Sequence, residues 1–210
     1  ADPADDYIDY RWITDEVHDI IWTASGTINK VDLYYSKDNF ADSNGDGVPD
    51  NQIPMKDKNG VNALGVSMGS LRSGSNFVYK WKVPDDRSEN VSVRVYDSAD
   101  HEVYAEGPKS LGGHDKMEID YATITFDLRD LTTNQPIQGL NVKGTDGWIS
   151  TGIASPKTHD VPASPAGSNW EATFTHESYG TITVPYLVGW DNDNKKWMRD
   201  RTIYRTMETL

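Results

Sequence analysis

The chain contains no cysteine, although it is 210 residues long. Disulfides, thiolate zinc sites and cysteine nucleophiles are therefore excluded. The lack of cysteine does not indicate a cytosolic protein, because large exported bacterial proteins often avoid this residue. Stability must instead come from packed cores, with bound cations as a further source.

Positive charge and long apolar runs are also scarce. Lys and Arg number 20 against 33 Asp and Glu, which gives a net charge of -13 at pH 7. This acidity argues against nucleic acid and anionic membranes as partners, and it suits an extracellular setting. No apolar run reaches the length of about 18 residues that a membrane span needs, so we expect no membrane insertion. No signal-peptide pattern opens the sequence, and we interpret the chain as a piece of a longer exported protein.

Helical periodicity is nearly absent from the sequence. Short apolar and aromatic runs alternate with turn residues, a pattern that predicts an all-β fold built from β-sandwiches. Within Ser92–Asp97, Val93 and Val95 are expected to point inward and Arg94 outward. The expected strands are Tyr7–Ile13, Val17–Thr23, Lys30–Ser36, Asn76–Val83, Ser92–Asp97, Glu102–Glu106, Ile119–Leu128, Leu140–Lys143, Trp170–Thr175, Thr181–Trp190 and Thr202–Thr206.

A stretch of Gly, Pro and polar residues, Gly107–Lys116, separates two sets of strand patterns. We expect residues 109–116 to be a linker. The sequence therefore predicts two tandem Ig-like β-sandwich domains, at residues 1–108 and 117–210. The first domain is expected to carry an insertion at about residues 40–74.

The insertion contains an aspartate-rich loop, Asp42-Ser43-Asn44-Gly45-Asp46-Gly47-Val48-Pro49-Asp50. Oxygen-bearing side chains occupy loop positions 1, 3, 5 and 9, and a glycine at position 6 permits a sharp turn around a hard cation. We therefore predict a calcium site with the ligands Asp42, Asn44, Asp46, the Val48 carbonyl and Asp50. The alternative is a solvated turn, because Asn, Asp and Gly favour turns without metal as well.

The loop is not an EF-hand. Position 12 is Ile53 rather than a bidentate Glu, and strand patterns rather than helices flank the loop. It resembles the helix-free aspartate-rich loops of thrombospondin type 3 repeats and the first loop of dockerin repeats. This resemblance implies bound calcium and a location outside the cytosol.

Four segments of the first half, in order, resemble a known kind of module. They are Ile20–Gly26 (IIWTASG), Val31–Asp38 (VDLYYSKD), Tyr79–Asp85 (YKWKVPD) and Val91–Asp97 (VSVRVYD). They are similar to the Ig-like modules repeated in large bacterial cell-surface and surface-layer proteins, related to the Kre9/Knh1-type Ig-like module. The resemblance spans about residues 17–106 and implies a sandwich with a structural role at the cell surface.

The second half has a weaker resemblance. Residues 130–142, DLTTNQPIQGLNV, look like the opening hairpin of carboxypeptidase-regulatory-like or Cna-B-like sandwiches, with Asn134-Gln135-Pro136 in the turn. Such modules are spacers and stalks rather than enzymes. Residues 148–168 depart from this pattern, so the topology of the second domain stays open.

Motifs for catalysis are missing from the sequence. The five histidines show no metal-ligand spacing, and no Gly-x-Ser-x-Gly nucleophile motif occurs. We therefore expect no enzyme, with a secreted hydrolase that uses two facing carboxylates as the weakest alternative. Asp191-Asn192-Asp193-Asn194 is interpreted as a hairpin turn rather than a second cation site.

Aromatic residues leave a second kind of function open. Flat sugar faces pack on indoles, so Trp148, Trp170, Trp190 and Trp197 are candidate ligand-binding residues, with Tyr34, Tyr35 and Tyr104 as further candidates. Large aromatics also fill sandwich cores, and we expect this of Trp22 and Trp81.

Together these patterns predict a calcium-stabilised structural module of an extracellular bacterial surface protein. A surface-layer, stalk or adhesin building block fits, with neighbouring modules or subunits as partners and glycans as a second partner class. The alternative is a carbohydrate-binding or accessory module of a secreted polysaccharide-processing enzyme.

Overall fold

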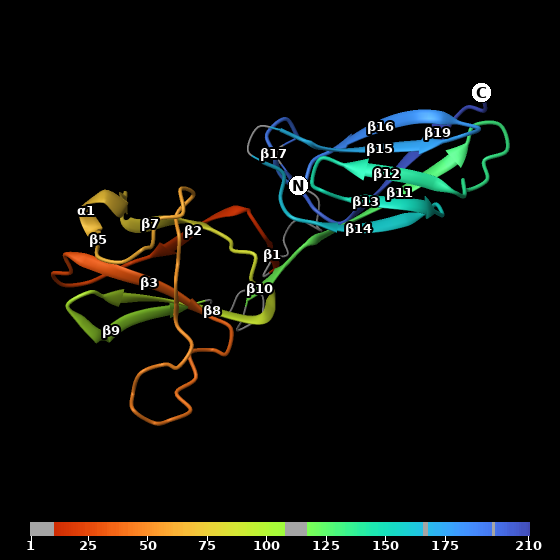
Figure 1. Ribbon diagram of the computed structural model, residues 1–210. Coiled ribbons are helices and arrows are strands. Elements are labelled where there is room, and N and C mark those ends of the chain that lie inside the picture. Colours follow the sequence, from red (N-terminus) through yellow and green to blue (C-terminus); the bar gives the residue numbers. More distant parts are fainter. Residues whose placement is uncertain (1–10, 108–116, 166–167, 195) are drawn as a thin grey trace. The chain divides into compact units, whose positions relative to one another are not determined.

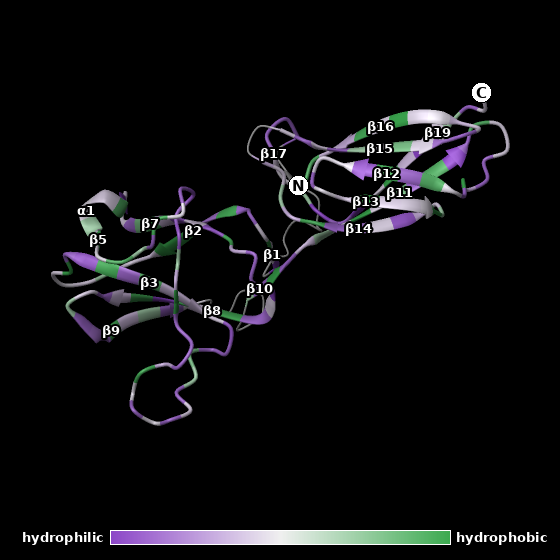
Figure 2. Cartoon of the chain, in the orientation of Figure 1, coloured by the Kyte–Doolittle hydropathy of each residue, from purple (hydrophilic) through white to green (hydrophobic). Residues whose placement is uncertain are grey.

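The computed structural model describes residues 11–107, 117–165, 168–194 and 196–210. The chain forms two compact units, Ala1–Asp120 and Tyr121–Leu210. Strands dominate both units (Figure 1), so the predicted all-β class is confirmed. Apolar residues concentrate along the strands, whereas the connecting segments are largely hydrophilic (Figure 2).

The first unit packs a larger sheet against a smaller one. The larger sheet has the order β1 (Arg11–Ile13), β10 (Met117–Asp120), β8 (Ser88–Asp97), β3 (Lys30–Ser36) and β4 (Ile53–Pro54), with β5 (Val66–Ser67) on β3 and β9 (Asp100–Gly107) on β8. The smaller sheet is β2 (Val17–Trp22), β7 (Asn76–Lys82) and β6 (Arg72–Ser73), and the helix α1 (Met68–Leu71) precedes β6. Strand β1 pairs with β10 in parallel, and the other pairs are antiparallel.

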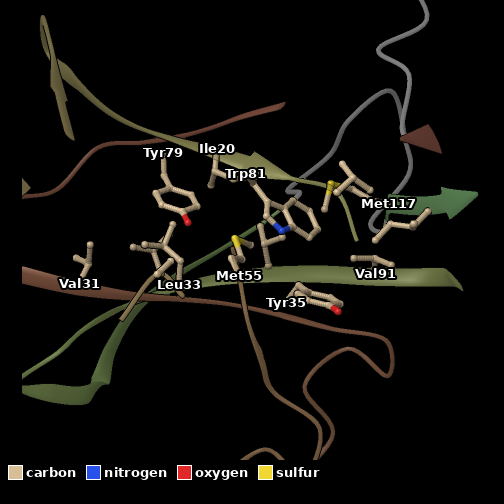
Figure 3. Close-up of a cluster of buried hydrophobic side chains, with 14 of the residues drawn as sticks. Ile20, Val31, Leu33, Tyr35, Met55, Tyr79, Trp81, Val91 and Met117 are labelled. Atoms are coloured by element: carbon tan, nitrogen blue, oxygen red, sulfur yellow. The ribbon is translucent and has the colours of Figure 1, made fainter. Parts of the chain in front are cut away.

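The core of the first unit lies between these two sheets. Because alternate residues of a strand face opposite sides, β3 buries Val31, Leu33 and Tyr35 on one face. Figure 3 shows Tyr79 and Trp81 of β7 on the opposite side of this cluster. Trp81 is 1 % exposed, as predicted for a core residue, whereas Trp22 is half-buried at the edge of the same cluster.

The insertion contributes to this core as well as to the surface. Met55 and Ala63 are fully buried, and backbone hydrogen bonds join both residues to Leu33 of β3. Residues 53–73 therefore continue the sandwich through the short elements β4, β5, α1 and β6. The aspartate-rich loop, from Asp42 to Asp50, is largely exposed.

The second unit is also a two-sheet sandwich. One sheet is β14 (Lys157–Val161), β11 (Ala122–Asp130) and β19 (Arg201–Met207), and the other is β13 (Ile149–Ile153), β12 (Leu140–Gly144), β15 (Trp170–His176) and β16 (Gly180–Tyr186). Between them, the Phe126 ring lies 5.2 Å from Phe174 and 5.3 Å from Tyr186, measured between centroids. A small hairpin, β17 (Gly189–Asp191) and β18 (Lys196–Met198), completes the unit.

The structure corrects the predicted domain boundary. The expected strand Ile119–Leu128 is two strands that belong to different units, because β10 pairs with β8 and β1 whereas β11 pairs with β14 and β19. Met117 and Ile119 are buried in the core of the first unit, so this unit extends to residue 120 rather than 108. The predicted linker, residues 109–116, lies outside the described residues.

Two more strand predictions need correction. The expected strand Thr181–Trp190 is divided into β16 and β17, and the Asp191–Asn194 segment forms the turn of the β17–β18 hairpin, as expected. Strands β13 and β14 lie in residues 148–168, where the sequence predicted no strand. Residues 7–10 of the first expected strand lie outside the described residues.

Candidate functional site

The aspartate-rich loop is anchored to the first unit at its base. Ser36, the buried last residue of β3, accepts the Phe40 N–H at 3.0 Å. The Ser92 hydroxyl of β8 donates to Asn39 at 2.7 Å. The Asp50 N–H donates to the Ala41 carbonyl at 3.0 Å and closes the loop. The loop therefore projects from a fixed base at the end of β3.

Inside the loop, the predicted ligands bind the backbone of the loop itself. The Asp42 carboxylate accepts the Gly45 N–H at 2.7 Å and the Gly47 N–H at 2.8 Å. Asn44 accepts the Asp46 N–H at 2.9 Å. Gly45 and Gly47 have positive φ angles of 75° and 85°, which a residue with a side chain adopts only with strain.

The remaining predicted ligands complete this pattern. Asp46 accepts the Val48 N–H at 2.8 Å. Asp50 accepts the Ser43 N–H at 2.8 Å and the Asn44 amide at 3.2 Å. All five predicted ligand residues thus belong to one curled segment, and each is exposed to solvent.

The types of ligand atom in the loop favour calcium binding, whereas their arrangement does not form a metal site. Carboxylate, amide and carbonyl oxygens are the ligands that calcium prefers. Among the described residues, however, no group of three or more His, Asp or Glu side chains is arranged to hold a metal ion. The chemistry of the loop fits calcium, and in this structure the Asp42 and Asp46 carboxylates accept backbone N–H groups of the loop.

A groove of about 730 Å³ lies beside the loop. Loop residues from Asp42 to Pro49 line one side, and residues of β8 and β9 from Arg94 to Tyr104 line the other. The Arg94 guanidinium carbon lies 4.3 Å from the Phe40 ring centroid and 4.5 Å from that of Tyr104. The sequence indicated that Arg94 points outward, but not that Phe40, 54 positions earlier, packs against it.

The aromatic candidates of the second unit do not share one surface role. Trp148 packs against Phe126, His159 and Phe174, so it belongs to the interior cluster. Trp170 is half-buried and donates its indole N–H to the Pro162 carbonyl at 3.1 Å.

Trp190 is the more accessible candidate, at 43 % exposure on β17. It pairs in register with Trp197 of β18, whose side chain lies outside the described part of the structure. Of the tyrosines, Tyr35 is buried, whereas Tyr104 is half exposed at the groove.

Comparisons with known proteins give little further guidance. No protein-family model and no curated protein matches the chain. The major pilin subunit of Bacillus cereus is 11% identical over 95% of this chain and 67% of its own, with a TM-score of 0.33. The pilus 2b backbone protein of group B streptococcus is 10% identical over 94% of this chain and 85% of its own, with a TM-score of 0.28. Both scores are too low to carry an argument, so function is argued from the residues of this chain. Among the described residues, no helix is long and apolar enough to cross a membrane.

Proposed function

We propose that the chain is a structural module of an extracellular bacterial surface assembly, such as a surface layer, stalk or adhesin. The observation that carries the proposal is the tandem arrangement of two sandwiches, each with a separate buried core. Two β units in sequence suit a load-bearing spacer, because each unit encloses its own core.

Self-association tests this function. Sedimentation velocity over a wide concentration range, followed by electron microscopy of the heavier fractions, should show ordered fibres or sheets. A chain that stays monomeric at every concentration, and that also fails to join a fragment carrying its flanking modules, would contradict an assembly role.

We also propose that calcium stabilises the first unit through the loop. The ion would offset the repulsion among the Asp42, Asp46 and Asp50 carboxylates and would order the exposed segment between Ala41 and Asn51. Support comes from the ligand spacing and from the curled backbone held at Gly45 and Gly47. Because calcium would bind the folded loop more tightly than the unfolded chain, it would raise the melting temperature of the first unit.

Metal content and calorimetry with calcium or with excess chelator test this proposal. We expect about one ion per chain and a calcium-dependent rise in melting temperature that the Asp42→Asn/Asp46→Asn double variant lacks. Asp57→Asn is the matched control, because Asp57 accepts the Asn59 and Val61 N–H groups in a similar turn outside the calcium pattern. Equal melting temperatures with calcium and with chelator would reduce the loop to a polar turn.

A second candidate function, sugar binding, is favoured by the exposure of Trp190 on the small hairpin. An exposed indole can stack against a flat sugar ring. Screening on a glycan array, followed by titration of wild type and Trp190→Ala with any glycan bound, tests this reading. Sugar binding is rejected if no glycan binds or if Trp190→Ala binds as wild type does.

A further inference from the structure

The groove beside the aspartate-rich loop is rich in negative charge. Asp42 and Asp46 line it from the loop, and Asp100 and Glu102 line it from β9. All four residues are exposed, and none of them forms a salt bridge among the described residues. A ligand in the groove would therefore meet four carboxylates.

The guanidinium and the imidazole of the groove wall already have partners. Arg94 donates to Glu106 at 2.7 Å and to the Tyr96 hydroxyl at 3.2 Å. The His101 ring is hydrogen-bonded to Asp32 at 2.9 Å. The charges of Arg94 and Glu106 compensate each other, so the positive charge in the groove wall is neutralised locally. The charge that the groove presents to a ligand is therefore negative.

One further feature favours a cationic ligand. Tyr104 is 49 % exposed, so part of its ring remains open although Arg94 contacts it. An aromatic face of this kind attracts cations.

We infer that this groove binds a lysine- or arginine-bearing segment of a neighbouring protein. Ammonium and guanidinium groups supply only hydrogen-bond donors, and their positive charge is attracted by the four carboxylates. The groove has the size of a pocket that holds a few residues. A neutral sugar would leave the carboxylates uncompensated, and a phosphorylated or acidic segment would be repelled.

The inference rests on the proposed function in one respect, namely that the basic segment belongs to a neighbouring subunit of the assembly. The preference for a basic ligand follows from the residues of the groove. If calcium binds the loop, it will lower the negative charge at Asp42 and Asp46. We therefore expect a basic segment to bind more weakly in calcium than in chelator.

The test uses the full chain and a fluorescent Gly-Lys-Gly-Arg-Gly-Lys-Gly peptide, with a Gly-Glu-Gly-Asp-Gly-Glu-Gly peptide for comparison. Anisotropy titrations in chelator should show binding of the basic peptide alone, weakened by added salt. Asp100→Asn/Glu102→Gln should raise the Kd about fivefold. Both positions are exposed in β9, and thermal melts confirm that the variant is folded.

The matched control is Glu89→Gln/Glu208→Gln, which removes the same charge at exposed positions that do not line the groove. The control should leave the Kd nearly unchanged. No binding of the basic peptide, or an equal loss of binding in both double variants, would overturn the inference. If the chain binds the basic peptide but never self-associates, the peptide-binding groove is supported and self-assembly is contradicted. If the chain self-associates but does not bind the peptide, the inference about the groove is overturned and the proposed assembly role stands.

Discussion

The imidazole of His159 lies flat against the indole of Trp148, with 4.3 Å between ring centroids and 11° between ring planes. His159 is also hydrogen-bonded to Asp146, whose side chain is 2 % exposed and which accepts the Tyr186 hydroxyl at 2.9 Å. In the first unit, His18 stacks on Trp12 at 4.2 Å and is hydrogen-bonded to the buried Glu16 at 2.7 Å. Each unit thus holds a buried carboxylate beside a Trp–His stack.

The Asp146 carboxylate predicts an acid-sensitive second unit. Burial raises the pKa of Asp146, but hydrogen bonds from His159, the Trp148 N–H and Tyr186 outweigh burial and lower this pKa below its usual value. The folded state therefore binds this proton less tightly than the unfolded state. The stabilisation is complete above the unfolded pKa of about 3.9 and is lost as the pH falls through the folded pKa.

Urea unfolding at a series of pH values checks this prediction. Asp146→Asn should be less stable than wild type at neutral pH, but it should lose less stability between about pH 5 and pH 2. Asp193→Asn, at an exposed turn of the same unit, serves as the control. Parallel losses in wild type and Asp146→Asn would contradict the role of this carboxylate.

Tyr35 predicts that the first unit loses stability at alkaline pH rather than at acidic pH. Burial and the hydrogen bond that its hydroxyl donates to Asp86, 2.9 Å long, raise the pKa of Tyr35 above its usual value. Its contribution to stability is therefore complete below the unfolded pKa of about 10 and is lost at higher pH.

Tyr35→Phe should flatten this alkaline loss, because phenylalanine does not titrate. Unfolding followed by tryptophan fluorescence at about pH 8 to 11 gives the measurement. Tyr204→Phe, at a tyrosine that is 64 % exposed, is the control. An alkaline slope in Tyr35→Phe as steep as that of wild type would refute the assignment.

The contacts of Arg94 predict that lysine cannot replace it. Its guanidinium packs on Phe40 and Tyr104 and pairs with Glu106, while its side chain is 14 % exposed. Lysine keeps the charge but loses the planar stacking and the fixed fork of donors. Arg94→Lys should therefore destabilise the first unit by about 1–2 kcal/mol in urea unfolding.

Arg72→Lys is the matched substitution for this prediction. Arg72 is exposed and lies 5.8 Å from a single ring, that of Phe77. Its replacement should cost clearly less than that of Arg94. Equal costs for the two variants would mean that stacking on two rings adds nothing.

The strands that the sequence predicted best are those with one buried face. Lys30–Ser36 has the predicted bounds, and Asn76–Lys82 ends one residue early, because both alternate around a core. The boundary at Tyr121 was missed because no Gly or Pro separates the apolar residues of Met117–Tyr121 from those of Ala122–Leu128, and only the phase of the alternation shifts there. Strands β4, β5 and β6 have two residues each, too few to show a period.

The site was predictable only in part. The curl of Asp42–Asp50 follows from local spacing, because the Asp side chains accept hydrogen bonds from backbone N–H groups a few residues further along the chain. The groove depends on contacts between Phe40, Arg94 and Tyr104, which are distant in sequence. No local pattern carries such contacts. Burial likewise separates Trp148 from Trp190, although both are tryptophans in strand-rich segments.

The separate cores predict two separable unfolding transitions. Trp81 packs against Trp12 and Tyr35 in the first unit, and Phe174 packs against Phe126 and Trp148 in the second. Trp81→Phe and Phe174→Leu each remove buried volume, which costs roughly 1–3 kcal/mol because the surrounding side chains collapse only partly. Each variant should lower the stability of its own unit alone.

Hydrogen exchange read by mass spectrometry under partly denaturing conditions resolves the two units by peptide. Trp81→Phe should speed exchange in β3, β7 and β8, and Phe174→Leu should speed it in β11, β12 and β15. Each variant is the control for the other, because both truncate a fully buried aromatic side chain. If either substitution accelerated exchange equally in both units, the two sandwiches would unfold as one cooperative body, and the tandem-module reading would have to be abandoned.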